Sequence, residues 1–150
     1  MPHKEPSFDL EDFVPYLLNR AAEGTSLEFG KYYKTKYGML RTEWRVLFHL
    51  GRYGELTAKS ICERADIHKT KISRAVGALE KKRFLARKSI EDDKRHEALS
   101  LTTAGMSAFE DLLEQAQRYN DEFMAPYSEK ERMIIRRFLL DTSKRVKNSS

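Results

Sequence analysis

Hydrophobic residues recur every three or four positions near both ends of the chain, which is the spacing of amphipathic helices. Near the N-terminus this stripe runs through residues 9–36, and Pro15 delays the start of regular helix because proline fits only a first turn. Toward the C-terminus the stripe begins at Thr102, is interrupted at Pro126, and resumes after an S-x-x-E capping sequence at Ser128. Both ends therefore predict long helices with an apolar face.

Shorter helical patterns, separated by turn residues, fill the middle of the chain. A second helix is predicted from an N-cap at Thr42 to the glycine-containing stretch 51–56. A short third helix begins at another N-cap, Thr57, and ends in a tight corner at Asp66. A fourth helix then carries HKTKISRAVGALEKK, residues 68–82.

Two period-two segments follow the fourth helix. Residues 84–90 and 96–101 are predicted to pair as antiparallel strands, with the acid–base sequence EDDKR at 91–95 as their connecting loop. Two short helices, a corner and a β-hairpin occur in the order of a winged helix-turn-helix. We therefore expect a mainly α fold with a small β-hairpin wing. The expected boundaries are 41–101 for the winged lobe and 9–40 and 102–145 for the flanking helices, within a single unit 1–150.

Basic charge is concentrated in the expected lobe. Residues 41–95 hold 15 Lys and Arg against 8 Asp and Glu, whereas the rest of the chain holds 13 against 15. A confined positive field suits a polyanion, with nucleic acid as the first candidate and anionic lipid as the second. No apolar run approaches the ~18 residues of a membrane span. The single cysteine, Cys62, excludes an intrachain disulfide, and we expect a cytoplasmic protein with no membrane partner.

The leading face of the fourth helix is suited to duplex DNA. A helix fits the major groove, where side-chain donors reach guanine N7 and O6 and phosphate oxygens. The hairpin tip can reach a neighbouring minor groove, and an aspartate beside its cations would orient them by a charge-assisted hydrogen bond. The bland alternative is a solvated helix and a solvated loop. The predicted DNA-binding residues are His68, Lys69, Thr70, Lys71, Ser73, Arg74, Asp93, Lys94 and Arg95.

Three stretches of the chain resemble the MarR family of bacterial transcriptional regulators: LRTEWRVLFHL, LTAKSICERADIHKTKISRAVGALEKKRFLARK and DDKRHEALSLTTAG. The resemblance covers roughly residues 10–140. Its most specific part is D-K-R followed, after five residues, by L-T-x-x-G, where the family usually has D-R-R. Ser73 and Arg74 fall on the family's recognition-helix Ser-Arg. His68 replaces an acidic or small capping residue, and Arg83 stands where the family often has glycine.

The resemblance implies a homodimer whose first and last two helices intertwine, each lobe binding one half of a pseudo-palindromic operator in double-stranded DNA. It also implies a repressor whose DNA affinity is lowered by a small, anionic aromatic or phenolic ligand, held between the dimer helices and the lobe. The alternative is that the polar and aromatic residues there are structural. The candidate ligand residues are Tyr16, Arg20, Tyr37, Trp44, Arg45 and His49.

Catalytic and metal-dependent functions lack supporting motifs. The chain has no G-x-S-x-G, no phosphate-cradling glycine loop and no C-x-x-C, and its four histidines lack ligand spacing. Cys62 is expected to face inward as a structural thiol. We therefore expect no catalytic residue, metal or cofactor. The alternative function is a winged-helix module that binds protein or RNA without small-molecule control, and a two-fold DNA site with a dimer in solution would discriminate against it.

Overall fold

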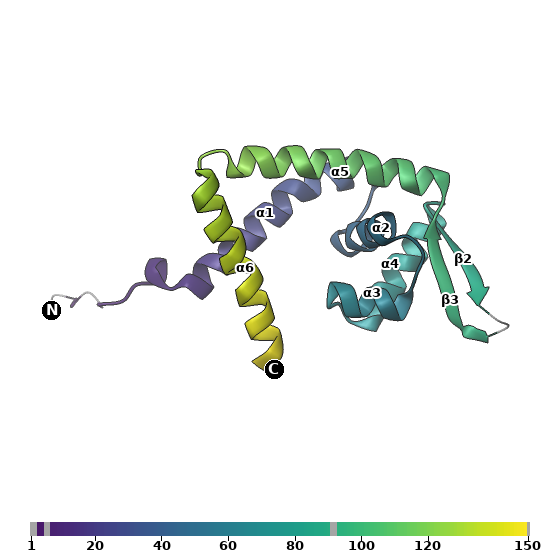
Figure 1. Cartoon of the computed structure of the whole chain (residues 1–150), viewed down its shortest axis with the longest axis horizontal. Coiled ribbons are helices and arrows are strands. Elements are labelled where there is room, and N and C mark those ends of the chain that lie inside the picture. The colour runs from purple at the N-terminus through teal and green to yellow at the C-terminus, as the bar shows by residue number, and fades with distance from the viewer. Residues whose placement is uncertain (1–2, 5–6, 91–92, 150) are drawn as a thin grey trace. The chain divides into compact units, whose positions relative to one another are not determined.

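The computed structural model describes residues 3–4, 7–90 and 93–149, and the side chains of these residues outside 93–96 and 148–149. The fold is mainly α with a small antiparallel sheet, as the sequence predicts (Figure 1). The chain divides within its fifth α-helix into two compact units, Met1–Leu113 and Glu114–Ser150. In chain order the elements are η1 (Leu10–Asp12), α1 (Val14–Tyr37), α2 (Arg41–Tyr53), β1 (Leu56–Thr57), α3 (Ala58–Ala65), α4 (Lys69–Lys81), β2 (Leu85–Ile90), β3 (Asp93–Leu101), α5 (Thr103–Met124) and α6 (Glu129–Ser149).

The N-terminal helical stretch consists of two elements. Asp9 caps the short 3-10 helix η1 by accepting a hydrogen bond from the Leu10 amide at 2.6 Å. The backbone of Phe13 is extended, so α1 begins at Val14 with Pro15 in its first turn. The predicted late start is therefore confirmed, whereas a single helix over 9–36 is wrong. Proline at this point has no helical hydrogen bond to lose, because the first four amides of a helix are unpaired.

The start of α2 differs from the predicted cap. Thr42 lies inside the helix, and Leu40 is the N-cap residue. Glu43 replaces the missing side-chain cap, because its Oε2 accepts a hydrogen bond from the Leu40 amide at 3.1 Å. Its Oε1 accepts from Lys82 Nζ at 2.9 Å, although the Glu43 side chain is only 5% exposed. A buried carboxylate needs such partners, since an unpaired one would be strongly destabilising.

Helices α2, α3 and α4 supply about half of the buried core residues of the first unit, and α1, the strands and the first half of α5 supply most of the others. The predicted N-cap of α3 is confirmed, because Thr57 Oγ1 accepts from the Ser60 amide at 3.1 Å. The corner between α3 and α4 is confirmed as well, with Asp66 in the left-handed region at φ 54°. Each fully buried Leu or Ile contributes roughly 1.5–3 kcal/mol. Side chains at most 1% exposed include Val46, Leu47, Leu50, Ile61, Ile72, Leu79 and Leu99.

The sheet has three strands in the order β1-β3-β2, one more than the predicted hairpin. The extra strand, β1, precedes α3 and pairs Leu56 with Leu99. Strand β3 begins at Asp93, so the predicted loop at 91–95 is too long and the predicted strand start at His96 is too late. We call β2 and β3 together the wing. The β2–β3 register pairs Arg87 with Leu99 and has an irregularity between Ser89 and Ile90.

The junction between the wing and α5 explains the L-T-x-x-G sequence. Thr102 Oγ1 accepts from the Gly105 amide at 3.0 Å and donates to the Arg83 carbonyl at 2.7 Å. The predicted helix start at Thr102 is thereby confirmed. A Cβ at Gly105 would lie 2.0 Å from the Phe84 carbonyl oxygen, so only glycine permits this approach of α5 to the start of β2.

An aromatic cluster joins α1, α2 and the first half of α5. Trp44 stacks on Tyr33 with ring centroids 5.9 Å apart and meets Phe48 edge-on at 5.3 Å. Phe48 meets Phe109 edge-on at 5.5 Å. Offset and edge-to-face pairs of this kind contribute about 0.5–1.5 kcal/mol beyond the area they bury. Trp44, predicted as a ligand residue with a structural role as the alternative, is thus part of a packed aromatic cluster.

The second unit contains the end of α5 and all of α6. Its predicted capping box is confirmed, because Glu131 accepts from the Ser128 amide at 2.9 Å and Ser128 Oγ accepts from the Glu131 amide at 3.2 Å. These bonds to Ser128 lower the pKa of the Glu131 carboxyl. Helix α6 extends to Ser149, beyond the predicted end at 145.

Candidate nucleic-acid interface

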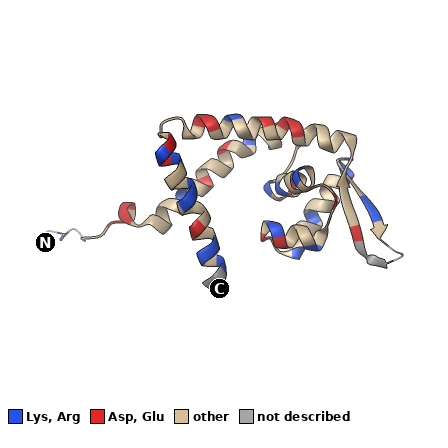
Figure 2. Cartoon of the chain, in the orientation of Figure 1, with Lys and Arg blue, Asp and Glu red and all other residues tan. Residues whose placement is uncertain are grey.

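Helix α4 buries its apolar side chains and exposes its polar ones. Ile72, Val76 and Leu79 are at most 2% exposed and anchor the helix in the core. Figure 2 shows Lys and Arg on α4 and on strand β2. Five of the predicted DNA-binding residues thus point away from the core: Lys69, Thr70, Lys71, Ser73 and Arg74 are all exposed.

His68 is the N-cap residue of α4. Its Nδ1 accepts a hydrogen bond from the Thr70 amide at 3.2 Å, and its backbone is extended at φ −60° and ψ 145°. A ring nitrogen that accepts carries no proton, so in the neutral ring the proton is on Nε2. The departure from an acidic or small residue therefore leaves the helix capped, with an exposed imidazole at its leading end.

The predicted wing contacts lie at the start of β3. Asp93, Lys94 and Arg95 belong to this strand by their backbone, but their side chains fall outside the described residues. Their proposed roles stay predictions. Toward the wing base, Ala86, Arg87 and Lys88 are exposed on β2.

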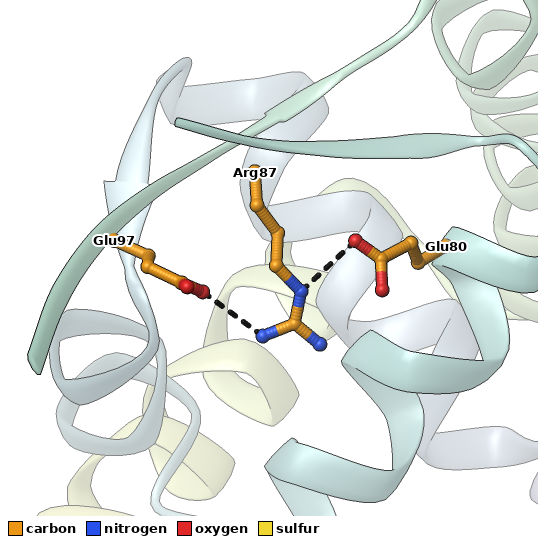
Figure 3. Close-up of polar contacts among 3 residues, drawn as sticks. All are labelled: Glu80, Arg87 and Glu97. Carbon is orange, nitrogen blue, oxygen red and sulfur yellow. Dashed lines mark hydrogen bonds and ion pairs between the residues drawn. The ribbon is translucent and has the colours of Figure 1, made fainter. Parts of the chain in front are cut away.

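An ion-pair network links the wing to α4 (Figure 3). Arg87 Nε donates to Glu80 Oε2 of α4 at 3.0 Å, and its Nη1 donates to Glu97 Oε2 of β3 at 3.1 Å. The bond to Glu97, and with it the bond to Glu80, raises the pKa of the Arg87 guanidinium. Sequence reasoning missed this network, because Glu97 meets Arg87 only through the β2–β3 register and Glu80 meets it only through the packing of α4 against β2.

A groove of about 540 Å³ lies between α3, α4 and the wing. Val76 and Leu99 supply apolar surface, while Lys59, Lys69 and Arg87 supply cationic groups. Cys62 packs against the core, as predicted for an inward-facing residue, but it is only half-buried and also lines the groove. The sequence had no signal for this groove, because its walls come from three elements whose packing is tertiary.

The turn after α4 contains a strained residue. Arg83 has φ 64°, in the left-handed region that disfavours every residue with a Cβ. Its amide donates to the Glu80 carbonyl at 2.9 Å and its own carbonyl accepts from Thr102. The backbone at Arg83 thus has the left-handed geometry that glycine would adopt without strain, although the residue there is not glycine.

The six predicted ligand residues take part in separate contacts. Two of them pair with each other on α1, one lies at the end of α1, and three lie along α2. Tyr16 and Arg20 face each other on α1, with the guanidinium 5.8 Å from the ring centre. The Tyr37 hydroxyl donates to Asp111 of α5, which also pairs with Lys36 at 2.8 Å. Burial, followed by the bond to Asp111, raises the pKa of Tyr37 to about 12. Tyr37 therefore acts structurally, holding the end of α1 against α5.

The other three candidates lie along α2. Trp44 belongs to the aromatic cluster, and His49 Nδ1 lies 2.6 Å from the Arg45 carbonyl of the preceding turn. Partial burial, followed by the nearby Arg41, lowers the pKa of the Arg45 guanidinium. The two guanidiniums thus raise the positive potential beside a half-buried indole, a combination that suits an anionic aromatic molecule.

Neither a metal centre nor a membrane span is found in the part of the chain that the structure describes. No group of three or more His, Cys, Asp and Glu side chains there could hold a metal ion. None of the helices there is both long and apolar enough to cross a bilayer.

The fold and its exposed basic helix define a winged helix-turn-helix protein. The model of the MarR family matches residues 37–96, which run from the end of α1 into the wing. Over these residues the chain is similar to the MarR family of transcriptional regulators.

Relatives and solved structures show the same similarity. YwaE, an uncharacterized HTH-type transcriptional regulator of Bacillus subtilis, is 29% identical over 119 residues, covering 79% of this chain and 69% of YwaE. The crystal structure of a MarR/EmrR family transcriptional regulator from Acinetobacter sp. ADP1 matches with a TM-score of 0.83 at 23% identity, over 94% of this chain and 99% of that one.

Two further similar structures contain bound molecules. S. aureus MepR was solved as a DNA complex and matches with a TM-score of 0.79 at 17% identity, over 87% of this chain and 96% of MepR. NadR was solved in complex with 4-hydroxyphenylacetate and matches with a TM-score of 0.71 at 19% identity, over 96% of this chain and 99% of NadR. At these identities the likeness is one of fold.

Proposed function

We propose that the protein is a homodimeric, sequence-specific DNA-binding regulator, and that it acts as a repressor. The observation that carries the proposal is the division of α4 into a buried apolar face and an exposed face of donors. Helix α4 enters the major groove, where Arg74 and the two lysines at its start contact base edges or phosphates. His68 meets a phosphate through Nε2–H. The DNA complex of MepR, a protein of the same fold, supports DNA as the partner.

Apolar side chains on two helices support self-association. On α1 and the residue before it, Phe13, Val14 and Leu17 are 40–46% exposed. On α6, Phe138 and Leu139 are similarly exposed. Exposed apolar surface of this extent favours a protein interface, and a two-fold dimer is the simplest closed assembly. A two-fold dimer binds two half-sites about one helical turn, ~34 Å, apart.

The wing contributes the second DNA contact of each protomer. Lys94 and Arg95 enter the minor groove or meet its phosphates, and Asp93 orients them. Two wings and two copies of α4 then read an inverted repeat.

The effector is a small anionic aromatic molecule. Arg45 and Arg41 supply positive potential, and Trp44 offers an aromatic surface. Tyr16 and Arg20 of α1 form a second cation–aromatic pair of the same chemistry. The complex of NadR with a phenolic carboxylate supports this ligand class for the fold. Binding of the effector lowers DNA affinity if it favours a conformation in which the two lobes no longer match the half-sites.

Selection of bound duplexes from a random DNA pool tests the function directly. At roughly 150 mM salt nonspecific electrostatic binding is weakened, so a regulator recovers an inverted repeat of two short half-sites. Sedimentation of the same sample is expected to give a dimer. A monomer that recovers no consensus would instead favour a winged-helix module that binds protein or RNA. Titration of 4-hydroxyphenylacetate and related phenolic carboxylates into the complex then tests the effector class.

A further inference from the structure

We propose that Arg87 is a positioning residue: its guanidinium, shared between Glu80 of α4 and Glu97 of β3, fixes the angle at which the wing leaves the winged lobe. This inference rests on the proposed DNA-binding function, because it concerns how two DNA-reading elements are held in register. Arg87 itself touches no base in this scheme. It acts through the wing.

The network lies at the point where the core stops supporting the wing. Leu85, the first residue of β2, is 3% exposed, whereas Ala86 to Ile90 are all exposed. Arg87 pairs in register with Leu99, which is 1% exposed, and the next residue toward the tip, Ala98, is the last buried residue of β3 among those described, at 4%. Beyond this level the described strand residues of β2 have no core beneath them.

Strand β1 holds the β3 side of the wing to the lobe, where Leu56 pairs with Leu99 and Thr57 with Ala98, and backbone bonds hold the wing at its base. There the Phe84 amide donates to the Leu79 carbonyl at 3.0 Å, and the Thr102 amide donates to the Phe84 carbonyl at 3.1 Å. These bonds join the end of α4 to the first residues of the wing. The Arg87–Glu80 ion pair adds a second attachment three residues further along β2 (Figure 3). The ion pair thus holds the β2 edge of the wing to α4, whereas β1 holds the β3 side, so the angle of the outer strand depends on Arg87.

The geometry also separates Arg87 from the DNA-contacting cations. Its Nε and Nη1 are directed to two carboxylates on opposite sides, so the positive charge is largely compensated within the protein (Figure 3). Lys69 and Arg74 of α4 are exposed on the same lobe and have no carboxylate partner among the described contacts. Because two carboxylates compensate its charge, Arg87 is a weak ligand for phosphate and is suited to hold the wing in place. We call the Arg87–Glu80 ion pair the brace.

Solvent exposure distinguishes the two consequences of breaking the brace. The side chains of Arg87, Glu80 and Glu97 are 38%, 45% and 35% exposed, so the ion pairs contribute little to unfolding stability. The orientation of the wing, in contrast, depends on them. Loss of the Glu80 bond is therefore expected to change DNA discrimination while leaving the melting temperature nearly unchanged.

Glu80→Ala and Glu97→Ala form a matched pair for the test. Both remove one negative charge, but only Glu80→Ala breaks the attachment to α4. We expect Glu80→Ala to lose hydroxyl-radical protection at the DNA positions under the wing, to keep protection under α4, and to lower the ratio of operator to non-operator affinity about three- to five-fold. Glu97→Ala is expected to change this ratio by no more than about two-fold. Equal effects of the two variants, or no effect of either, would overturn the proposal.

A measurement without DNA separates this inference from the proposed function. Spin labels at Lys81→Cys on α4 and Lys88→Cys on β2, in a Cys62→Ser background, report the angle as a distance distribution by electron–electron resonance. We expect Glu80→Ala to broaden the distribution and Glu97→Ala to leave it narrow. If the wild type selects no operator but this difference is found, the DNA-binding proposal fails and the brace stands. If the distance distribution of Glu80→Ala is as narrow as that of the wild type, the positioning role of Arg87 is refuted, whatever the DNA-binding result.

Discussion

Glu43 and Lys82 form an ion pair, at 2.9 Å, between the first turn of α2 and the residue that ends α4. The same carboxylate accepts the Leu40 amide through its other oxygen. One buried side chain therefore caps α2 and fixes the end of α4 to the α1–α2 junction.

Removal of the lysine should reveal the cost of leaving this carboxylate alone. We expect Lys82→Met to lower the free energy of unfolding by about 2 kcal/mol, less than for a fully buried pair because the Lys82 side chain is 30% exposed. Urea denaturation measures the change. Lys81→Met, one residue earlier and exposed, is the control and should differ from the wild type by less than about 0.5 kcal/mol. Equal losses in the two variants would contradict the role of Glu43.

Gly105 has a steric role that alanine cannot fill. We expect Gly105→Ala to destabilise the protein by about 2–3 kcal/mol, because the new Cβ would meet the Phe84 carbonyl oxygen at 2.0 Å and backbone must move. Thermal melting provides the comparison with Gly24→Ala, in the open interior of α1, where no atom lies within 4 Å. The control should gain about 0.5–1 kcal/mol from helix propensity. An unchanged melting temperature in Gly105→Ala would show that α5 can move away from the Phe84 carbonyl at little cost.

Arg83 should be replaceable by glycine with a gain. Because its φ is 64°, we expect Arg83→Gly to stabilise the protein by about 0.5–1 kcal/mol, the left-handed strain outweighing the entropy of glycine in the unfolded chain. Arg83→Ala, which removes the same charge but retains a Cβ, separates strain from electrostatics. A gain of the same size in both variants would assign the effect to charge.

The Asp111 contacts predict a loss of stability in acid. The bonds from Lys36 and Tyr37 lower the pKa of Asp111 below 3.8, so its stabilisation is complete above that value and is lost as the pH falls through the folded-state pKa. For Tyr37, whose pKa is about 12, the stabilisation holds below pH ~10 and disappears toward pH 12. We expect Asp111→Asn to make the free energy of unfolding less dependent on pH below pH 4. An acid limb as steep as that of the wild type would place its origin elsewhere.

DNA affinity should depend on salt through the exposed cations of α4. Arg74→Ala is expected to weaken operator binding and, if the guanidinium meets a phosphate, to reduce the slope of log affinity against log salt by about one. Fluorescence anisotropy over a salt series measures both quantities. A weaker affinity with an unchanged slope would assign Arg74 to a base instead. Arg95→Ala is expected to show the same slope change for the wing.

The elements that sequence reasoning placed well are those with strong local signals. The caps at Thr57 and Ser128 and the apolar stripe of α4 depend on neighbours within one or two turns, so their spacing is visible in the sequence. Strand β1 was missed because two residues are too few for a period, and it forms only by pairing with β3. Threonine is a residue type that often caps helices, so Thr42 is the predicted N-cap. In the structure the helix starts earlier, and the Glu43 side chain accepts the hydrogen bond of the Leu40 amide.

The residues of the candidate site likewise fall into those placed by local spacing and those placed by tertiary packing. Exposure of Lys69, Ser73 and Arg74 follows from helical periodicity, which the sequence contains. The partners of Arg87 depend on strand register, and those of Tyr37 on a contact with Asp111 across 74 positions. Charge pairing between distant segments is decided by packing, so no motif in the sequence could have shown it.

The aromatic cluster also gives the protein a built-in optical reporter. Trp44 is the single tryptophan of the chain, and its indole is stacked on Tyr33 at the meeting point of α1, α2 and the first half of α5. Emission from the unmodified protein therefore arises from one known place, next to the guanidiniums proposed to attract the effector. Binding in solution can be followed from this residue without a dye, and every variant that spares Trp44 carries the same probe.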